Sequence, residues 1–353
     1  MTKIWDPVRI GEMTLPQRLA MAPMTRDRST PEGVPSELNA LYYAQRASTG
    51  LLITEGTQPS EDGQGYLLTP GIHSAAQVAG WRKVTDAVHA AGGKLFIQLM
   101  HVGRISHPDN TPHHRQPVAP SAVKPAGSMF TFGGPKEHPE PRALSTDEVA
   151  ATVKDFASAA KLAVEAGADG VEIHGANGYL VQQFLSSNAN LRSDRYGGSI
   201  ENRIRFAVEV AKATAEAIGP SRVGIRISPG GTFNDIVEDD ARALYAALVA
   251  ALAPLGLAYL HVVHPRDEDW ARSFRDAWPG ALILNRPGAP FEARQADVES
   301  GLADVASVGQ LALANPDLVS RLKTGAELNK PDPASYYGGD AKGYTDYPTL
   351  AAG

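Results

Sequence analysis

The segment His174-Gly175-Ala176-Asn177-Gly178-Tyr179 holds the densest group of side chains that could carry out chemistry. His174 and Asn177 follow an apolar run and stand three residues apart, so both could donate hydrogen bonds to one carbonyl oxygen. Tyr179 stands two residues further on and could then supply a proton. The structural alternative is a loop with a satisfied histidine and a surface tyrosine, but the three residues together at the end of a predicted strand favour a catalytic site.

Arg226 lies inside another apolar run, where a charged side chain is unusual. A buried arginine needs an anionic or strongly polar partner. That partner is either a loop carboxylate, in a structural ion pair, or the negative edge of a cofactor. His101, His107 and the pair His113-His114 have no tight ligand spacing and no carboxylate that completes a set, so we expect no metal site.

The elements that must position these residues alternate between strand and helix along most of the chain. Short apolar runs predict eight strands, at residues 18–22, 51–54, 94–99, 170–174, 223–227, 259–263, 282–284 and 304–308. Helical patterns lie at residues 36–47, 75–91, 145–166, 200–217 and 238–253, and a last helix follows from about 315. This order predicts an α/β fold, a single-domain (β/α)8 TIM barrel over residues 1–353.

Two segments do not follow the alternation. Residues 101–145 are rich in Pro, His, Gly and Ser, and we expect them to form a long loop excursion after the third strand, with room for a short hairpin. The excursion ends at Ser145, which matches a capping box with Glu148 at the start of the next helix. Residues 325–353 are expected to form a C-terminal tail near the active-site face.

The active site of such a barrel lies at the C-terminal ends of its strands, where polar side chains converge. Phosphate groups are often held there by the loops after strands seven and eight. The candidates are Asn285-Arg286-Pro287-Gly288 and Val308-Gly309-Gln310-Leu311. No G-x-G-x-x-G motif follows a strand, so a Rossmann dinucleotide site is not expected.

The composition excludes several classes of protein. The chain has 33 basic and 39 acidic residues and a net charge of −6, which gives no electrostatic reason to expect nucleic acid. It has no cysteine, which excludes disulfides, thiolate chemistry and metal sites built on cysteine. No apolar run approaches the roughly 18 residues of a membrane helix, and the start has no signal-peptide pattern. We therefore expect a cytoplasmic protein with no membrane partner.

Several motifs along nearly the whole chain resemble the Old Yellow Enzyme family of FMN-dependent ene reductases, which includes the N-ethylmaleimide reductase-like enzymes. The matching blocks are Met21-Ala22-Pro23-Met24-Thr25-Arg26, Tyr42-Tyr43-Ala44-Gln45-Arg46-Ala47, Ile53-Thr54-Glu55-Gly56-Thr57, Gln98-Leu99-Met100-His101-Val102-Gly103-Arg104, residues 170–180, residues 195–203, Ala314-Asn315-Pro316-Asp317-Leu318 and Gly343-Tyr344-Thr345-Asp346-Tyr347-Pro348. The order and number of these blocks make chance agreement implausible.

The resemblance implies a barrel with FMN across its C-terminal mouth and NAD(P)H as the hydride donor, in ping-pong kinetics. The residues it assigns to the flavin are Pro23, Met24, Thr25, Gly56, Gln98 and Arg226. His174 and Asn177 would bind the oxygen of a small-molecule enone or nitroalkene, and Tyr179 would be the general acid. The residues expected to line the substrate pocket are Tyr66, Met100 and Tyr344. The protein would be a monomer or a homodimer.

The chain departs from the family pattern in three places. Met100 stands where the family usually has Trp, and residues 285–290 replace a Gly-Gly stretch after strand seven. Gly309-Gln310 replaces a Gly-Arg pair whose arginine binds the FMN phosphate. Either Arg286 has taken over the phosphate, with Gly288 and Gly309 beside it, or Arg286 is a solvated loop residue and FMN is bound more weakly.

Two further functions stay open at this level. The same fold could reduce nitroesters or nitroaromatics, or catalyse a specialised biosynthetic reduction or oxidation. A barrel that has lost tight FMN binding could instead serve as a ligand-binding protein, an alternative that rests on Gln310.

Overall fold

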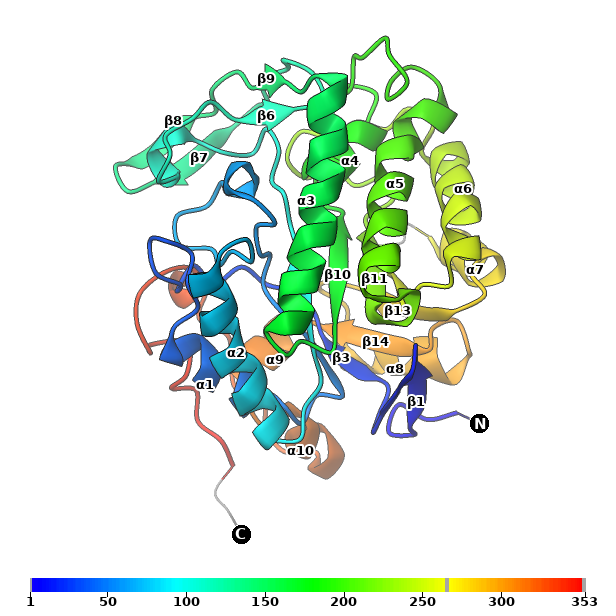
Figure 1. Cartoon of the computed structure of the whole chain (residues 1–353). Helices are drawn as coiled ribbons and strands as arrows, with labels where there is room; N and C mark the ends of the chain where they lie inside the picture. Colours follow the sequence, from blue (N-terminus) through cyan, green and yellow to red (C-terminus); the bar gives the residue numbers. More distant parts are fainter. Residues whose placement is uncertain (1, 264–266, 351–353) are drawn as a thin grey trace.

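Eight parallel strands close into a barrel in the computed structural model, which describes residues 2–263 and 267–350 (Figure 1). Around the barrel they follow chain order: β3 (Leu19–Met21), β4 (Leu51–Ile53), β5 (Leu95–Leu99), β10 (Gly170–Gly175), β11 (Val223–Ile227), β12 (Tyr259–Val263), β13 (Ala281–Asn285) and β14 (Val305–Val308). Each strand lies within about one residue of its predicted bounds, the usual uncertainty at element ends. The predicted α/β fold and (β/α)8 TIM barrel are confirmed.

The parallel register brings polar residues of neighbouring strands to the same level of the barrel. Glu172 of β10 pairs with Gln98 of β5, and His174 of β10 pairs with Arg226 of β11. Arg226 pairs in turn with His261 of β12. All five side chains are buried, so each must find its polar partners inside the protein or on a ligand.

Helices cover the outside of the barrel, as expected for a parallel sheet that is buried on both faces (Figure 1). They are α1 (Glu37–Gln45), α2 (Ala75–Ala90), α3 (Thr146–Glu165), α4 (Leu180–Leu185), α5 (Ile200–Ile218), α6 (Ala241–Leu252), α7 (Glu268–Ala277), α8 (Phe291–Glu299), α9 (Gln310–Ala314) and α10 (Leu318–Thr324). Among the described residues, no helix is both long enough and apolar enough to cross a membrane.

The sequence prediction of the helices was incomplete near the C-terminus. Helices α7, α8 and α9 were missed, and the helix predicted from about 315 is α10, which a break separates from α9. The break falls at Asn315, whose backbone is extended (φ −127°, ψ 91°). Pro316 follows it, and a proline disfavours helical backbone in the residue before it. The predicted capping box of Ser145 and Glu148 at the start of α3 is confirmed.

An antiparallel hairpin that the sequence did not predict closes the lower end of the barrel. It consists of β1 (Val8–Ile10) and β2 (Met13–Leu15). Val8, Ile10 and Leu15 pack in one apolar cluster with side chains of the barrel strands, such as Phe96 and Tyr259. The open end of the barrel is therefore the C-terminal end of its strands.

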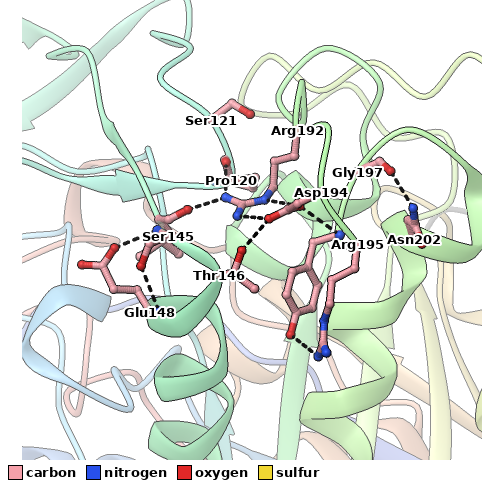
Figure 2. A network of polar contacts seen from close by, with 12 residues as sticks. Pro120, Ser121, Ser145, Thr146, Glu148, Arg192, Asp194, Arg195, Gly197 and Asn202 are labelled. Carbon is pink, nitrogen blue, oxygen red and sulfur yellow. Dashed lines mark hydrogen bonds and ion pairs between the residues drawn. The ribbon is translucent and has the colours of Figure 1, made fainter.

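The excursion at residues 101–145 contains short strands rather than only loop. β6 (Val118–Ala119) pairs with β9 (Arg142–Ala143), and β7 (Ser128–Thr131) forms the expected hairpin with β8 (Gly134–Glu137). Figure 2 shows how the excursion is fastened to the barrel: Arg192 donates to the carbonyl of Pro120 at 2.8 Å.

Asp194 lies at the centre of this group of polar contacts (Figure 2). Its carboxylate accepts hydrogen bonds from the Arg192 Nε at 2.9 Å and the Thr146 hydroxyl at 2.8 Å. The Arg192 guanidinium holds the pKa of Asp194 well below its ordinary value. The carboxylate therefore stays ionised, and it joins the excursion, α3 and the loop before α5.

We predict that Gly224→Ala destabilises the barrel. A Cβ atom at this position of β11 would lie 2.2 Å from the buried ring of Tyr259, which cannot move without disturbing the lower core. Overpacking of this kind typically costs about 1–3 kcal/mol. Urea denaturation should show the loss, and Gly133→Ala is the control, because its new Cβ would have no neighbour closer than 3.7 Å. Equal stability of the two variants would contradict this packing.

Candidate active site

The ends of the barrel strands enclose a central cavity of about 280 Å³. Most residues that the sequence placed at the active site line it: Pro23, Met24, Thr25, Gly56, Gln98, Met100, His174, Asn177, Tyr179, Arg226 and Gln310. Phe233, Tyr336 and Tyr337 also line it and were not predicted. The long separation of these residues in sequence shows that the barrel, and not a local loop, forms this site.

A larger lateral cavity of about 940 Å³ lies beside the central one. The two cavities share four lining residues, Pro23, Met24, Arg226 and Gln310. The lateral cavity extends from them to the loops after β13 and β14, where Gly288 and Gly309 lie. Together the cavities form an elongated space from the centre of the barrel mouth to the predicted phosphate loops.

His174 is the last residue but one of β10, and its side chain lines the central cavity. It is 3% exposed, and its Nδ1 atom has no hydrogen-bond partner in the described part of the chain. Burial lowers its pKa well below the ordinary value, helped by the positive charge of Arg226. His174 is therefore a neutral imidazole that can donate one hydrogen bond to a ligand.

Asn177 adopts a left-handed backbone conformation, with φ of 56°. Asparagine tolerates this region better than most residues. Its backbone is held on both sides: its N–H donates to the Ser228 hydroxyl and its carbonyl accepts from Asn234, each at 2.8 Å. The loop is thereby fixed with the Asn177 side chain at the central cavity.

Tyr179 meets a second tyrosine at the cavity wall. Its hydroxyl lies 2.8 Å from the hydroxyl of Tyr66, and its ring makes an edge contact with His174 at 5.1 Å between centroids. Burial raises the pKa of Tyr179 to about 12. The phenol is thus protonated throughout the neutral range, as a proton donor must be. Tyr66, which was expected to line the substrate pocket, is not among the residues that line the central cavity and is instead the hydrogen-bonding partner of Tyr179.

Arg226 has the properties of a ligand-binding arginine. It is 6% exposed and lines both cavities, and its Nε atom has no hydrogen-bond partner among the described residues. None of the ion pairs formed by residues 2–263 and 267–350 includes it. Of the two partners considered from the sequence, a loop carboxylate is therefore excluded within the described residues, and an anionic or polar ligand edge fits.

Arg286 is not where the sequence prediction placed it. Its guanidinium makes two hydrogen bonds to Asp297 of α8, from Nε at 2.6 Å and from Nη2 at 2.8 Å, and it also pairs with Glu268. It lines neither cavity. Both carboxylates come from helices α7 and α8, which the sequence analysis did not predict, so no pattern in the sequence indicated these contacts.

Arg294 of α8 lines the lateral cavity instead. Its guanidinium donates to the carbonyls of Arg286, Ala289 and Pro290, and its buried Nε has no partner within the described ranges. A cation in the first turns of a helix is opposed by the helix dipole. The sequence analysis did not predict α8, so it gave no signal that pointed to Arg294.

Tyr344 also departs from its prediction, because it does not line the central cavity. It is fully buried and stacks on Tyr42, with ring centroids 4.2 Å apart. Arg26 and Arg28 lie over the Tyr344 ring. The tail residues that do reach the cavity are Tyr336 and Tyr337.

The same two arginines hold the tail over the barrel mouth. Arg26 donates to the carbonyls of Tyr336 at 2.9 Å and Gly343 at 2.8 Å. Arg28 donates to those of Ser335 at 3.0 Å and Asp340 at 2.9 Å. The tail is thus a fixed wall of the cavity.

No group of three or more His, Asp or Glu side chains in the described parts of the chain could hold a metal ion. The residues present fit a planar, partly anionic organic cofactor better. Pro23, Met24 and Arg226 line both cavities of the elongated space, and the buried Nε atom of Arg226 has no partner among the described residues.

Comparison with known proteins agrees with this site. Residues 3–329 match the model of the NADH:flavin oxidoreductase / NADH oxidase family. The chain therefore belongs to that family, and it is a flavin-dependent oxidoreductase.

Individual relatives cover almost the whole chain. A probable flavin mononucleotide-dependent alkene reductase of Leishmania infantum is 44% identical over 358 residues, which cover 98% of this chain and 96% of the relative. The structure of morphinone reductase in complex with tetrahydroNAD superposes with a TM-score of 0.95 at 44% identity, covering 99% of this chain and 98% of that one. The old yellow enzyme homologue from Zymomonas mobilis gives 0.95 at 39%, covering 99% and 100%.

These matches confirm three expectations from the sequence. The chain has the Old Yellow Enzyme fold, it is an FMN-dependent NAD(P)H oxidoreductase, and it falls in the ene reductase class.

We predict that His174 stays neutral as the pH falls through about 6.5, where an unperturbed histidine gains its proton. Burial disfavours the imidazolium ion, so the midpoint of titration must lie lower. Nitrogen NMR of the imidazole groups measures this directly, and His174→Gln assigns the signal by removing it. A midpoint near the ordinary value would show that the His174 ring is solvated.

Proposed function

We propose that this protein reduces the activated C=C bond of α,β-unsaturated carbonyl or nitro compounds, with NAD(P)H as the source of hydride. The observation that carries the proposal is the meeting of His174, Asn177 and Tyr179 at one buried cavity. Two of them can donate hydrogen bonds to a substrate oxygen, and the third holds a proton that can be given up. The name of the Leishmania infantum relative, an alkene reductase, supports the same reaction.

FMN would lie across the two cavities. Pro23, Met24 and Thr25 would contact the flavin ring from the end of β3, while Gln98 and Arg226 would bind its polar edge. Gly56 keeps that region open, since an added Cβ would lie 2.4 Å from the Met100 side chain. When bound, the flavin supplies the hydride chemistry, which no side chain of the protein can provide.

His174 and Asn177 would polarise the substrate. Negative charge grows on the carbonyl or nitro oxygen as the C=C bond accepts a hydride, and two fixed donors stabilise that charge. The site is buried, so these hydrogen bonds are stronger than they would be in water. A neutral His174 donates without being titrated in the neutral range.

Tyr179 would complete the reduction by giving its phenolic proton to the α-carbon. The partner hydroxyl of Tyr66, 2.8 Å away, can then donate to the tyrosinate oxygen that remains. Met100 and the tail residues Tyr336 and Tyr337 would set the shape of the substrate pocket.

A steady-state screen tests the substrate class. Purified protein, supplied with FMN and either NADH or NADPH, should reduce cyclic enones, maleimides and nitroalkenes. Turnover of nitroesters or nitroaromatics alone would favour the related reductive role. Protein that binds no FMN would leave only a ligand-binding role.

We predict that Tyr179→Phe slows the alkene half-reaction by roughly 10²-fold or more, the usual contribution of a general acid. Flavin reduction by NAD(P)H needs no proton from Tyr179 and should change little. Stopped-flow measurement of the two half-reactions separates these effects. Tyr66→Phe is the matched control, because it removes the neighbouring hydroxyl and leaves the proton of Tyr179 in place. Equal slowing of both half-reactions in Tyr179→Phe would exclude the assigned role.

Arg294, rather than Arg286, would bind the phosphate of FMN. Arg294 lies on the wall of the lateral cavity with Gly288, Gly309 and Gln310, and its Nε is left without a partner by the described residues. Its other nitrogen atoms hold the loop after β13 by its carbonyls. Arg294 would thus both shape the phosphate loop and supply the positive charge that Gln310 lacks.

We predict that Arg294→Ala lowers the preference for FMN over riboflavin by at least tenfold, about the value of one charge-assisted hydrogen bond. Riboflavin lacks only the phosphate, so the ratio of the two dissociation constants isolates that group. Fluorescence titration measures both. Arg286→Ala is the control, because its guanidinium is already bound to Asp297. If the ratio is unchanged in Arg294→Ala, backbone amides rather than Arg294 bind the phosphate.

A further inference from the structure

A chain of hydrogen bonds crosses the inside of the barrel below the two cavities. Glu172 accepts from the Gln98 amide at 2.8 Å, and its other oxygen lies 2.8 Å from Nδ1 of His261. Nε2 of His261 lies 2.9 Å from the Ser307 hydroxyl. Ser307 in turn accepts from the Asn285 amide at 2.8 Å. The five residues come from five different strands and none is more than 5% exposed.

The directions of the hydrogen bonds in this chain follow from the protonation states of Glu172 and His261. The hydrogen bonds from His261 and Gln98 and the positive charge of Arg226 lower the pKa of Glu172 despite its burial, so the carboxylate is ionised and can only accept. Burial lowers the pKa of His261, which therefore carries a single ring proton. That proton must be on Nδ1 to reach Glu172, so Nε2 accepts from Ser307, and the Ser307 oxygen accepts from Asn285.

The two ends of the chain are side-chain amides at the cavities. Gln98 lines the central cavity, and Asn285 lines the lateral cavity. In each amide the NH2 group is held by the chain, which leaves the amide oxygen to a ligand. Without a fixed partner an amide side chain can rotate and exchange donor for acceptor, because its two ends have almost the same shape.

We propose that Glu172 is a positioning residue that fixes Gln98 and, through His261 and Ser307, Asn285 as hydrogen-bond acceptors toward the bound cofactor. This inference rests on the proposed placement of FMN. Oxidised flavin has one ring N–H, on the pyrimidine edge assigned to Gln98, and its ribityl chain has hydroxyl groups that Asn285 could accept from. This chain of hydrogen bonds thus favours a ligand that has hydrogen-bond donors both at Gln98 and at Asn285.

Glu172 also balances the charge of Arg226. Of the groups that act on Arg226, the Glu172 carboxylate is the one that most favours its charged form. Burying a carboxylate costs several kcal/mol unless it is well paired, so an apolar residue would serve the barrel core more simply. The presence of a charged residue at position 172 is explained by its effect on Arg226 and on the site above it.

The test uses two variants and two forms of the cofactor. Glu172→Gln keeps the shape of the side chain but can donate, so Gln98 is free to turn. Ser307→Ala separates Asn285 from His261 and leaves the Glu172–Gln98 contact intact. Ser106→Ala is the control, because it removes a buried hydroxyl that lies outside the chain and donates to Gln64. The cofactors are FMN and its 3-methyl derivative, which lacks the ring N–H.

In the parent, FMN should bind more tightly than 3-methyl-FMN. Glu172→Gln should reduce that discrimination by about tenfold, the value of one hydrogen bond to a charged or fixed partner. It should also raise the reduction potential of the bound flavin, because a negative charge near the ring is removed. Ser307→Ala should weaken the binding of both cofactors equally and leave the potential close to that of the parent.

The outcomes separate this inference from the proposed function. If Glu172→Gln keeps both the discrimination and the potential of the parent, Glu172 has only a structural role and the inference is wrong. If Glu172→Gln does not fold, Ser307→Ala decides, and binding no weaker than in Ser106→Ala overturns the inference. In both cases enone reduction and the Tyr179→Phe result still stand. A parent protein that binds no FMN would overturn both.

Discussion

The parallel register of the barrel strands is the constraint on which the site depends. Because β5, β10, β11 and β12 are neighbours in register, Gln98 pairs with Glu172 inside the barrel. His174, Arg226 and His261 form the next row of polar residues, two positions further along the strands. A shift of one strand by one residue would turn every one of its side chains to the other face of the sheet. The polar residues would then lie under the outer helices, where nothing could satisfy them.

The register also explains why the neutral donor His174 and the charged carboxylate of Glu172 lie at different depths in the barrel. Side chains of one strand that are two residues apart face the same way, so Glu172 lies below His174 along β10. The lower residue is ionised and fully enclosed, while the upper one is neutral and borders the cavity. The negative charge of Glu172 is thus kept away from the central cavity, whereas the positive charge of Arg226 lines it.

The sequence could predict the barrel and most of the cavity lining because both depend on local patterns. Apolar runs mark strands, and residues directly after them must lie at the barrel mouth. Arg286, Arg294 and Tyr344 could not be placed in this way. Each is directed by partners distant in sequence or on elements that the patterns missed, such as Asp297 on α8. Glu172 and His261 gave the same signal as Arg226, a polar residue inside an apolar strand, and their role depends on a pairing that only the fold reveals.

The hydrogen bonds that join Arg26 and Arg28 to the C-terminal tail have a consequence for biosynthesis. The hydrogen bond from Arg26 to Gly343 joins residues 317 positions apart. A ribosome must therefore synthesise nearly the whole chain before Tyr336 and Tyr337 can close the cavity wall. The barrel strands emerge first and can assemble while the mouth is still open to solvent. A nascent chain in that state would offer a flavin an unobstructed entrance, which the finished tail then narrows.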